Sequence, residues 1–184
     1  MEHIIYVLLI FALAYNTFPV ALGLDRDNRN SLFVNLLYAV IFGLSQGLMY
    51  KLGSLLGGEF MYLFVIRYKL AVFAILFAVS IRMFIEAFKI RKGARIFSFD
   101  NYIKLIIIAI AAGINTLIVG MAAEYLSPFE TLRILFLILA GFTWSIIGIS
   151  MNLTRKNIML SSFLHLTAGI IVLLTGTVYL LSTH

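Results

Sequence analysis

Long stretches without charged side chains dominate this sequence and limit what it can fold into. Five segments contain no Asp, Glu, Lys or Arg: 4–24, 32–50, 105–123, 134–154 and 157–183. A sixth, 70–88, contains only Arg82 and Glu86. Each is close to or above the roughly 18–20 residues that a helix needs to cross a bilayer. Only 12% of the 184 residues are charged, against about 25% in a soluble domain. We therefore predict an all-α integral membrane protein with six transmembrane helices.

Basic residues are unevenly distributed among the connections, and this predicts an orientation. The connections 25–31, 89–104 and 153–156 share one side and carry nine Lys and Arg residues. The opposite side carries four: Lys51, Arg67, Lys69 and Arg133. By the positive-inside rule the first side is cytoplasmic, so both termini are expected outside the cytoplasm. The net charge of +6 then reflects membrane topology, and no nucleic-acid partner is predicted.

Two short phrases repeat along the chain. "AYNTFPVAL" (14–22) and "GINTLIVGM" (113–121) align at an offset of 99, which matches Asn16 with Asn115 and Thr17 with Thr116. Each phrase lies in the first helix of a three-helix half, and the halves are residues 1–92 and 93–184. Because three is odd, the second half enters the membrane from the opposite side. We predict one membrane domain of two inverted three-helix repeats, an arrangement typical of secondary transporters.

The two asparagines are the main candidates for a binding site. A buried amide in hydrocarbon costs several kcal/mol unless it finds a partner. If the halves pack about a pseudo-twofold axis, the two amides face each other between the repeats. Their carbonyl oxygens suit hard divalent cations. The alternative is that both side chains are interhelical hydrogen-bond partners with a purely structural role.

Other polar side chains lie within the apolar segments. Gln46 and Met49 follow Gly43 and Gly47, whose four-residue spacing favours close helix packing. Arg82 and Glu86 are one turn apart and are predicted to form an ion pair, which is either part of an ion pathway or self-neutralising.

Two further residues carry weaker expectations. Pro19 removes a backbone N–H and is expected to free the carbonyl of Tyr15. This carbonyl is either a ligand for an ion or part of a simple kink. Ile118 occupies the matching position in the second half, so a one-sided break is expected. His165 is expected to be a hydrogen-bonded packing residue.

These segments together resemble the MntP-type manganese efflux pumps, small inner-membrane exporters of the lysine-exporter clan. The phrases that carry the resemblance are "YNTFPVALGL", "FGLSQGLMYKLG", "IRMFIEAFK" and "INTLIVGMA", in the order of the family's motifs. The chain also departs from the family pattern. The two midplane aspartates of the family fall on Asn16 and Asn115, the usual proline after Met49 is Tyr50, and Pro19 is an addition.

The resemblance implies a bacterial inner-membrane transporter that works by alternating access around a polar site at the membrane midplane. The candidate metal ligands are Asn16, Asn115, Gln46 and Glu86, and the other candidate path residues are Thr17, Thr116, Tyr15, Met49 and Arg82. Two neutral amides attract a divalent cation less than two carboxylates do. Two alternatives therefore stay open: transport of a monovalent cation or small polar solute, and a non-transporting membrane subunit that scaffolds a partner.

The remaining predictions concern cofactors and partners. No Gly-rich phosphate-binding phrase and no nucleophile–base pair stands in the sequence, so we predict neither an ATP-driven pump nor an enzyme. No cofactor is expected beyond a transported Mn²⁺ or other cation. The expected partners are the lipid bilayer, the transported ion or solute, and either a second copy of the chain or a membrane partner protein.

Overall fold

The computed structural model describes residues 2–24, 32–62, 67–92, 102–122, 130–151 and 153–181, and the regular elements in these ranges are helices. In chain order they are α1 (Glu2–Ala14), α2 (Thr17–Leu22), α3 (Leu32–Tyr62), α4 (Tyr68–Lys92), α5 (Tyr102–Ala112), α6 (Ile114–Gly120), α8 (Glu130–Ser150) and α9 (Arg155–Leu181). The all-α prediction is confirmed for this part of the chain.

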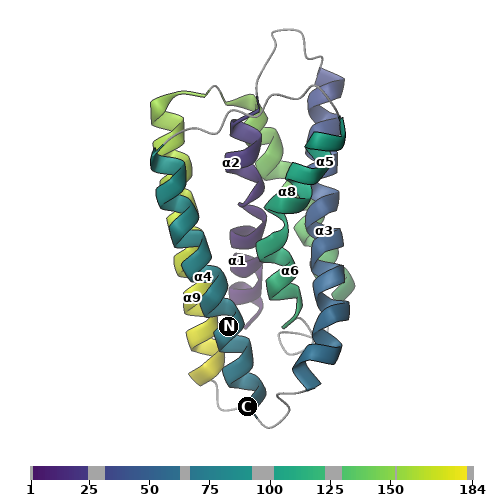
Figure 1. Ribbon diagram of the computed structural model, residues 1–184, viewed down its shortest axis with the longest axis vertical. Coiled ribbons are helices and arrows are strands. Elements are labelled where there is room, and N and C mark those ends of the chain that lie inside the picture. Colours follow the sequence, from purple (N-terminus) through teal and green to yellow (C-terminus); the bar gives the residue numbers. More distant parts are fainter. Residues whose placement is uncertain are drawn as a thin grey trace.

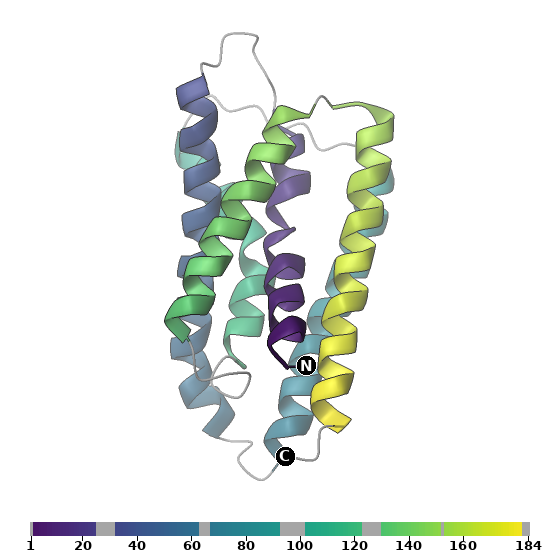
Figure 2. The same ribbon diagram turned by 180° about the vertical axis from the view of Figure 1, so that it is seen from behind.

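The helices form one elongated bundle with two outer pairs and a central group. Helices α4 and α9 run side by side along one flank, and α3 packs against α8 on the other (Figure 1). The short helices α1, α2, α5 and α6 lie between these pairs. The view from behind shows α8 crossing α3 at an angle while α9 stays close to α4 (Figure 2).

The surface of the bundle is largely apolar, as a lipid-facing surface must be. Four helical segments are long and apolar enough to cross a membrane: Leu32–Gly58, Tyr68–Lys92, Thr131–Ser150 and Arg155–Leu181. The bent pair Tyr102–Ala112 and Ile114–Gly120 makes a fifth if it is counted as one span, and Val7–Leu22 is a shorter apolar helix. Large side chains such as Leu32, Phe33 and Leu181 are exposed. The chain is therefore a multi-pass membrane protein.

Both short central segments are interrupted near their middle. The first breaks at Tyr15 and Asn16, between α1 and α2, and the second breaks at Gly113, with a 44° bend between α5 and α6. The expectation of a one-sided break is therefore wrong. Glycine has no side chain to stabilise the helix and weakens its interior, so Gly113 accounts for a second break without a proline.

The first break also differs from its expected form. The Tyr15 carbonyl accepts a hydrogen bond from the Phe18 N–H at 2.9 Å. The turn has tightened to the three-residue spacing of a 3₁₀-helix, which satisfies an end carbonyl that an α-helix would leave unpaired. The carbonyl is therefore engaged by the backbone and is not the free ligand that the proline suggested.

Several basic residues that the sequence places in connections belong to helices instead, among them Lys51 and Arg133. Lys51 lies within α3, which continues to Tyr62, and Arg133 lies in the first turn of α8. Arg133 is only 8% exposed, and its Nη1 donates to the Tyr50 hydroxyl at 2.5 Å. Its guanidinium also lies 5.6 Å from the centre of the Tyr50 ring. A buried arginine with such partners is compatible with a membrane-spanning segment.

Glycines on α3 allow the tightest contacts in the bundle. A Cβ added at Gly43 would lie 2.7 Å from the Ile138 carbonyl oxygen of α8. One added at Gly53 would lie 2.0 Å from the Leu117 carbonyl oxygen, and one at Gly57 2.1 Å from that of Met121. The backbone of α3 therefore rests directly on α8 at one end and on the segment of α6 at the other, as the glycine spacing predicts.

Candidate functional site

A cavity of about 280 Å³ lies between the broken central helices and the α4–α9 pair. Its inner end is lined by Asn16 and Asn115, which stand at the two helix breaks. Its outer end is lined by Lys89 in the last turn of α4, by Gly23 after α2 and by Leu153 before α9. The exposed Lys89 marks the mouth, so the cavity runs from the end of the bundle with many basic residues to the helix breaks.

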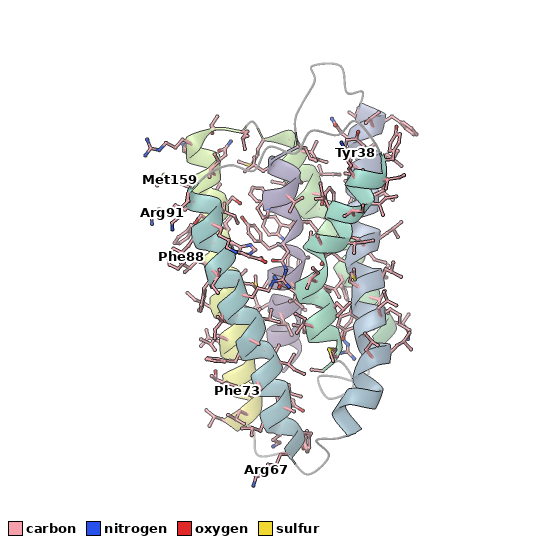
Figure 3. The ribbon with its side chains drawn as sticks, viewed as in Figure 1. Tyr38, Arg67, Phe73, Phe88, Arg91 and Met159 are labelled. Atoms are coloured by element: carbon pink, nitrogen blue, oxygen red, sulfur yellow. The ribbon has the colours of Figure 1, made fainter. Side chains whose placement is uncertain are left out.

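The two ends of the bundle can be followed along α4. Arg91 lies near one end of this helix, where the cavity opens, and Arg67 lies just before the other (Figure 3). Towards the Arg67 end the bundle is filled. Buried apolar side chains pack together there, including Leu9, Leu76 and Val119. Among the described residues, the interior is thus hollow on one side of the asparagines and packed with apolar side chains on the other.

Asn16 and Asn115 contact each other directly. The Asn115 Nδ2 donates to the Asn16 Oδ1 at 3.2 Å, and both side chains are almost completely buried. The Asn16 Nδ2 donates to the Leu13 carbonyl at 2.9 Å, within its own helix break. The Asn115 Oδ1 is buried and has no hydrogen-bond partner among the described residues. The pair therefore leaves one amide oxygen available at the inner end of the cavity.

The second polar group of the cavity consists of Glu86, Arg82 and His165. The Arg82 Nε donates to Glu86 Oε1 at 3.0 Å, which confirms the predicted ion pair. The other carboxylate oxygen, Oε2, lies 3.2 Å from His165 Nε2 on α9. Glu86 therefore uses one oxygen within α4 and the other to link α4 to α9. All three residues line the same cavity as the asparagines.

The other residues predicted from the sequence do not line the cavity, and two of them bond to each other. Thr116 donates to Gln46 Oε1 at 2.5 Å, and this buried pair joins α6 to α3. Thr17 donates to the carbonyls of Ala14 and Gly141, at 2.9 and 3.2 Å.

Tyr15 and Met49 also lie outside the cavity wall. The Tyr15 hydroxyl donates to the Ser161 carbonyl at 3.0 Å, which ties the first break to α9. Met49 is buried on α3. Among the candidate residues, the cavity brings together Asn16, Asn115, Glu86 and Arg82.

The contribution of α9 to the cavity was not predicted from the sequence. Ser161 and His165 both line the cavity and are both buried. Their four-residue spacing puts them on one face of the helix. The signal was present in "SSFLHL", a polar phrase within an apolar segment, but the sequence does not place this face against Glu86.

A cation in this cavity would be held by mixed ligands. In the described part of the chain, no group of three or more His, Cys, Asp and Glu side chains is placed to hold a metal ion. Amide oxygens, a hydroxyl, one carboxylate and one imidazole are the polar groups that line the cavity beside Arg82 and Lys89. Oxygen and imidazole ligands of these kinds fit a divalent ion of the first transition series.

Comparisons with known proteins agree on one family. Residues 30–180 match a family model described as "Putative manganese efflux pump". The chain is 33% identical over 181 residues to the "Putative manganese efflux pump MntP" of Aliarcobacter butzleri (strain RM4018), which covers 95% of this chain and 97% of that protein. No solved structure matches the chain. With the match extending over nearly its whole length, the chain belongs to the MntP family of manganese efflux pumps.

Proposed function

We propose that this chain is a secondary transporter of divalent cations of the manganese type, which alternates access to a site at the Asn16–Asn115 pair. Membership of the efflux-pump family supports a membrane cation exporter in general. The observation that carries the finer proposal is the one-sided cavity. It reaches from the basic ends of the helices to the asparagines, and apolar side chains close the bundle beyond them.

Two inverted three-helix halves form the proposed framework. The first half consists of the α1–α2 segment, α3 and α4, and the second of the α5–α6 segment, α8 and α9. Helices of matching position contact each other: α3 packs on α8, α4 packs on α9, and the two interrupted segments meet at Asn16 and Asn115. A pseudo-twofold axis between the halves would produce these pairings. Rocking one half against the other would move the opening from one side of the membrane to the other.

The orientation of the proposed transporter follows from its charges. The end of the bundle where the cavity opens carries Lys89, Arg91 and Lys92 in the last turn of α4, and the positive-inside rule assigns such an end to the cytoplasm. The conformation would then face inward, with both termini outside the cytoplasm. In a bacterial inner membrane, this conformation would receive its cargo from the cytoplasm, as export requires.

The cargo site would use the available oxygens. Among the described residues, Asn115 Oδ1 has no partner and Asn16 Oδ1 accepts only from the Asn115 amide. Glu86 places a carboxylate in the same cavity. Gln46 accepts from Thr116 and would support α6, where Asn115 lies. Mn²⁺ accepts carbonyl oxygens together with water, so the two amides can contribute to its site without the two aspartates of the family pattern, and the nearby carboxylate would offset part of its charge.

Two other functions compete with this one. The neutral amides favour a monovalent cation or a small polar solute as cargo, because they supply dipoles and no charge. A scaffold subunit is the second alternative, and such a subunit would be expected to fill its interior with side chains. The cavity favours transport over the scaffold.

Flux into proteoliposomes of the purified chain tests the proposal. Mn²⁺ flux in the native chain, reduced by Asn115→Ala and by Glu86→Gln, is the expected result. Thr143→Val is the matched control, because Thr143 is exposed and donates only to the Leu139 carbonyl of its own helix. Flux of Na⁺ or K⁺ with none of Mn²⁺ would support the monovalent alternative. Flux of Mn²⁺ that appears only in the Asn16→Asp/Asn115→Asp double variant would show that the native chain does not export this ion.

A further inference from the structure

Three residues that line the cavity each have a buried polar atom without a hydrogen-bond partner among the described residues. The atoms are Asn115 Oδ1, Ser161 Oγ and His165 Nδ1. Their residues come from α6 and α9, and none is more than 2% exposed. Buried polar atoms are almost always paired, so each exception requires an explanation. A ligand shared by these three residues would explain all three exceptions.

The contact with Glu86 determines what His165 can offer to such a ligand. An ionised carboxylate can only accept hydrogen bonds, so the His165 Nε2 that lies 3.2 Å from Glu86 Oε2 carries the proton. In the neutral ring, Nδ1 then has a free lone pair. A carboxylate that orients an imidazole through its N–H is the usual support of a metal-binding histidine. The Arg82 Nε, 3.0 Å from Glu86 Oε1, fixes the carboxylate in turn.

Ser161 and Asn115 extend the arrangement on two sides. Ser161 lies one turn before His165 on the same face of α9. The Tyr15 hydroxyl holds the Ser161 carbonyl at 3.0 Å and so anchors this turn of α9 to the first helix break. Asn115 lies across the cavity on α6, in contact with Asn16. The three unpaired atoms are therefore an imidazole nitrogen, a hydroxyl oxygen and an amide oxygen on elements that are held together.

We propose that His165 Nδ1, Ser161 Oγ and Asn115 Oδ1 bind the transported cation directly and that Glu86 acts as the positioning residue of His165. This inference rests on the proposed transport function and specifies its substrate class. Carbonyl and hydroxyl oxygens suit Mn²⁺, Mg²⁺ and Ca²⁺, whereas an imidazole nitrogen suits transition ions, among which Mn²⁺ binds least tightly. The mixed set therefore favours divalent transition ions, Mn²⁺ included, over Mg²⁺ and Ca²⁺, and the α9 histidine compensates for the missing aspartates.

The direct test is to detect histidine nitrogen on bound Mn²⁺. The chain has three histidines, so the His3→Gln/His184→Gln variant, purified without a histidine tag, leaves His165 alone. Electron spin-echo spectroscopy of Mn²⁺ bound to this variant is expected to show a nitrogen coupling. That coupling should change to the ¹⁵N pattern when histidine is labelled with ¹⁵N. Bound Mn²⁺ without a histidine coupling overturns the proposal, whether or not further variants fold.

A second measurement tests the selectivity. His165→Gln keeps a donor for Glu86 but removes the imidazole nitrogen. We expect Mn²⁺ to bind the native chain at least about tenfold more tightly than Mg²⁺, a preference of about 1.4 kcal/mol. The variant is expected to lose most of this preference. Ser161→Ala is expected to weaken Mn²⁺ binding less than His165→Gln does. Equal Mn²⁺-to-Mg²⁺ ratios in the native chain and in folded His165→Gln contradict the proposal.

The failure of this inference can be distinguished from failure of the transport function. One outcome is Mn²⁺ flux in proteoliposomes together with bound Mn²⁺ that lacks the histidine coupling. This outcome would support the transport function and would show that His165 does not bind the cation. If the native chain shows neither flux nor binding of Mn²⁺, both the transport function and this inference are overturned.

Discussion

Asn16 and Asn115 use their amide groups differently, although they occupy matching positions. Asn16 accepts from Asn115 through Oδ1 and donates to the Leu13 carbonyl through Nδ2. Asn115 donates through Nδ2, and its Oδ1 has no partner among the described residues. Introducing a carboxylate therefore disturbs a different contact at each position, which matters for any attempt to restore the aspartates of the family pattern.

We expect both Asn16→Asp and Asn115→Asp to destabilise the metal-free protein. Each change removes an amide donor and brings a carboxylate oxygen against an acceptor, which is the Leu13 carbonyl for Asn16→Asp and Asn16 Oδ1 for Asn115→Asp. The expected cost is about 1–3 kcal/mol for each variant. Saturating Mn²⁺, at about 100 times its Kd, should return about 2.7 kcal/mol. Thermal unfolding of both variants in detergent, with and without Mn²⁺, measures these effects. A metal-free variant as stable as the native chain would contradict this account of the pair.

The Thr116–Gln46 hydrogen bond offers a second residue-scale prediction. Thr116→Val removes the donor to Gln46 Oε1, and Gln46 Nε2 already has no partner among the described residues. We expect a loss of about 0.6–2 kcal/mol, the usual contribution of an interhelical hydrogen bond in membranes. Thr143→Val, at an exposed position on α8, is the control and should change little in the same thermal unfolding assay.

At the scale of single elements, α3 is the helix on which the second half of the bundle rests. Its glycines approach carbonyl oxygens of α8 and of the segment that follows Leu117. These are contacts with backbone atoms, which cannot rotate away as a side chain can. The position of α6, and with it that of Asn115, therefore depends on small residues at these points of α3.

Two neighbouring glycines test this dependence. A Cβ at Gly57 would lie 2.1 Å from the Met121 carbonyl oxygen, whereas a Cβ at Gly58 meets no described atom within 4 Å. We expect Gly57→Ala to destabilise the protein by about 1–3 kcal/mol or more through overpacking. Gly58→Ala should be neutral or stabilising by up to about 1 kcal/mol through helix propensity. Thermal unfolding compares them, and similar effects of the two changes would rule out close α3–α6 packing as the cause.

At the scale of the whole molecule, the bundle is hollow at one end and packed at the other. This asymmetry can be probed because the chain has no cysteine. Ala112→Cys lies in the cavity wall, and Leu76→Cys lies in the packed part, where Leu76 is completely buried. An impermeant thiol reagent should label Ala112→Cys in inside-out vesicles and spare Leu76→Cys. Labelling of Ala112→Cys only in right-side-out vesicles would mean that the cavity opens to the exterior.

The sequence predicts some levels of this molecule better than others. The uncharged segments predict apolar helices because hydrocarbon excludes charge. The Asn-Thr repeat makes Asn16 and Asn115 face each other only if the halves pack about a pseudo-twofold axis, so the contact itself could not be predicted from the sequence. The break at Gly113 and the extension of α3 through Lys51 were missed, because packing against neighbouring helices decides both. The α9 face of Ser161 and His165 was missed for the same reason: which face of a helix turns inward depends on its partner, here α4.

The hydrogen bond between the two asparagines has a consequence for the step in which a carrier resets. Two facing carboxylates repel each other when no ion is bound, so they need protons or a counter-ion before the halves can come together again. Two amides satisfy each other without either. A carrier built on such a pair can return empty, with no obligatory exchange. Net export of a cation would then need a cytoplasmic excess of that cation large enough to overcome an inside-negative membrane voltage.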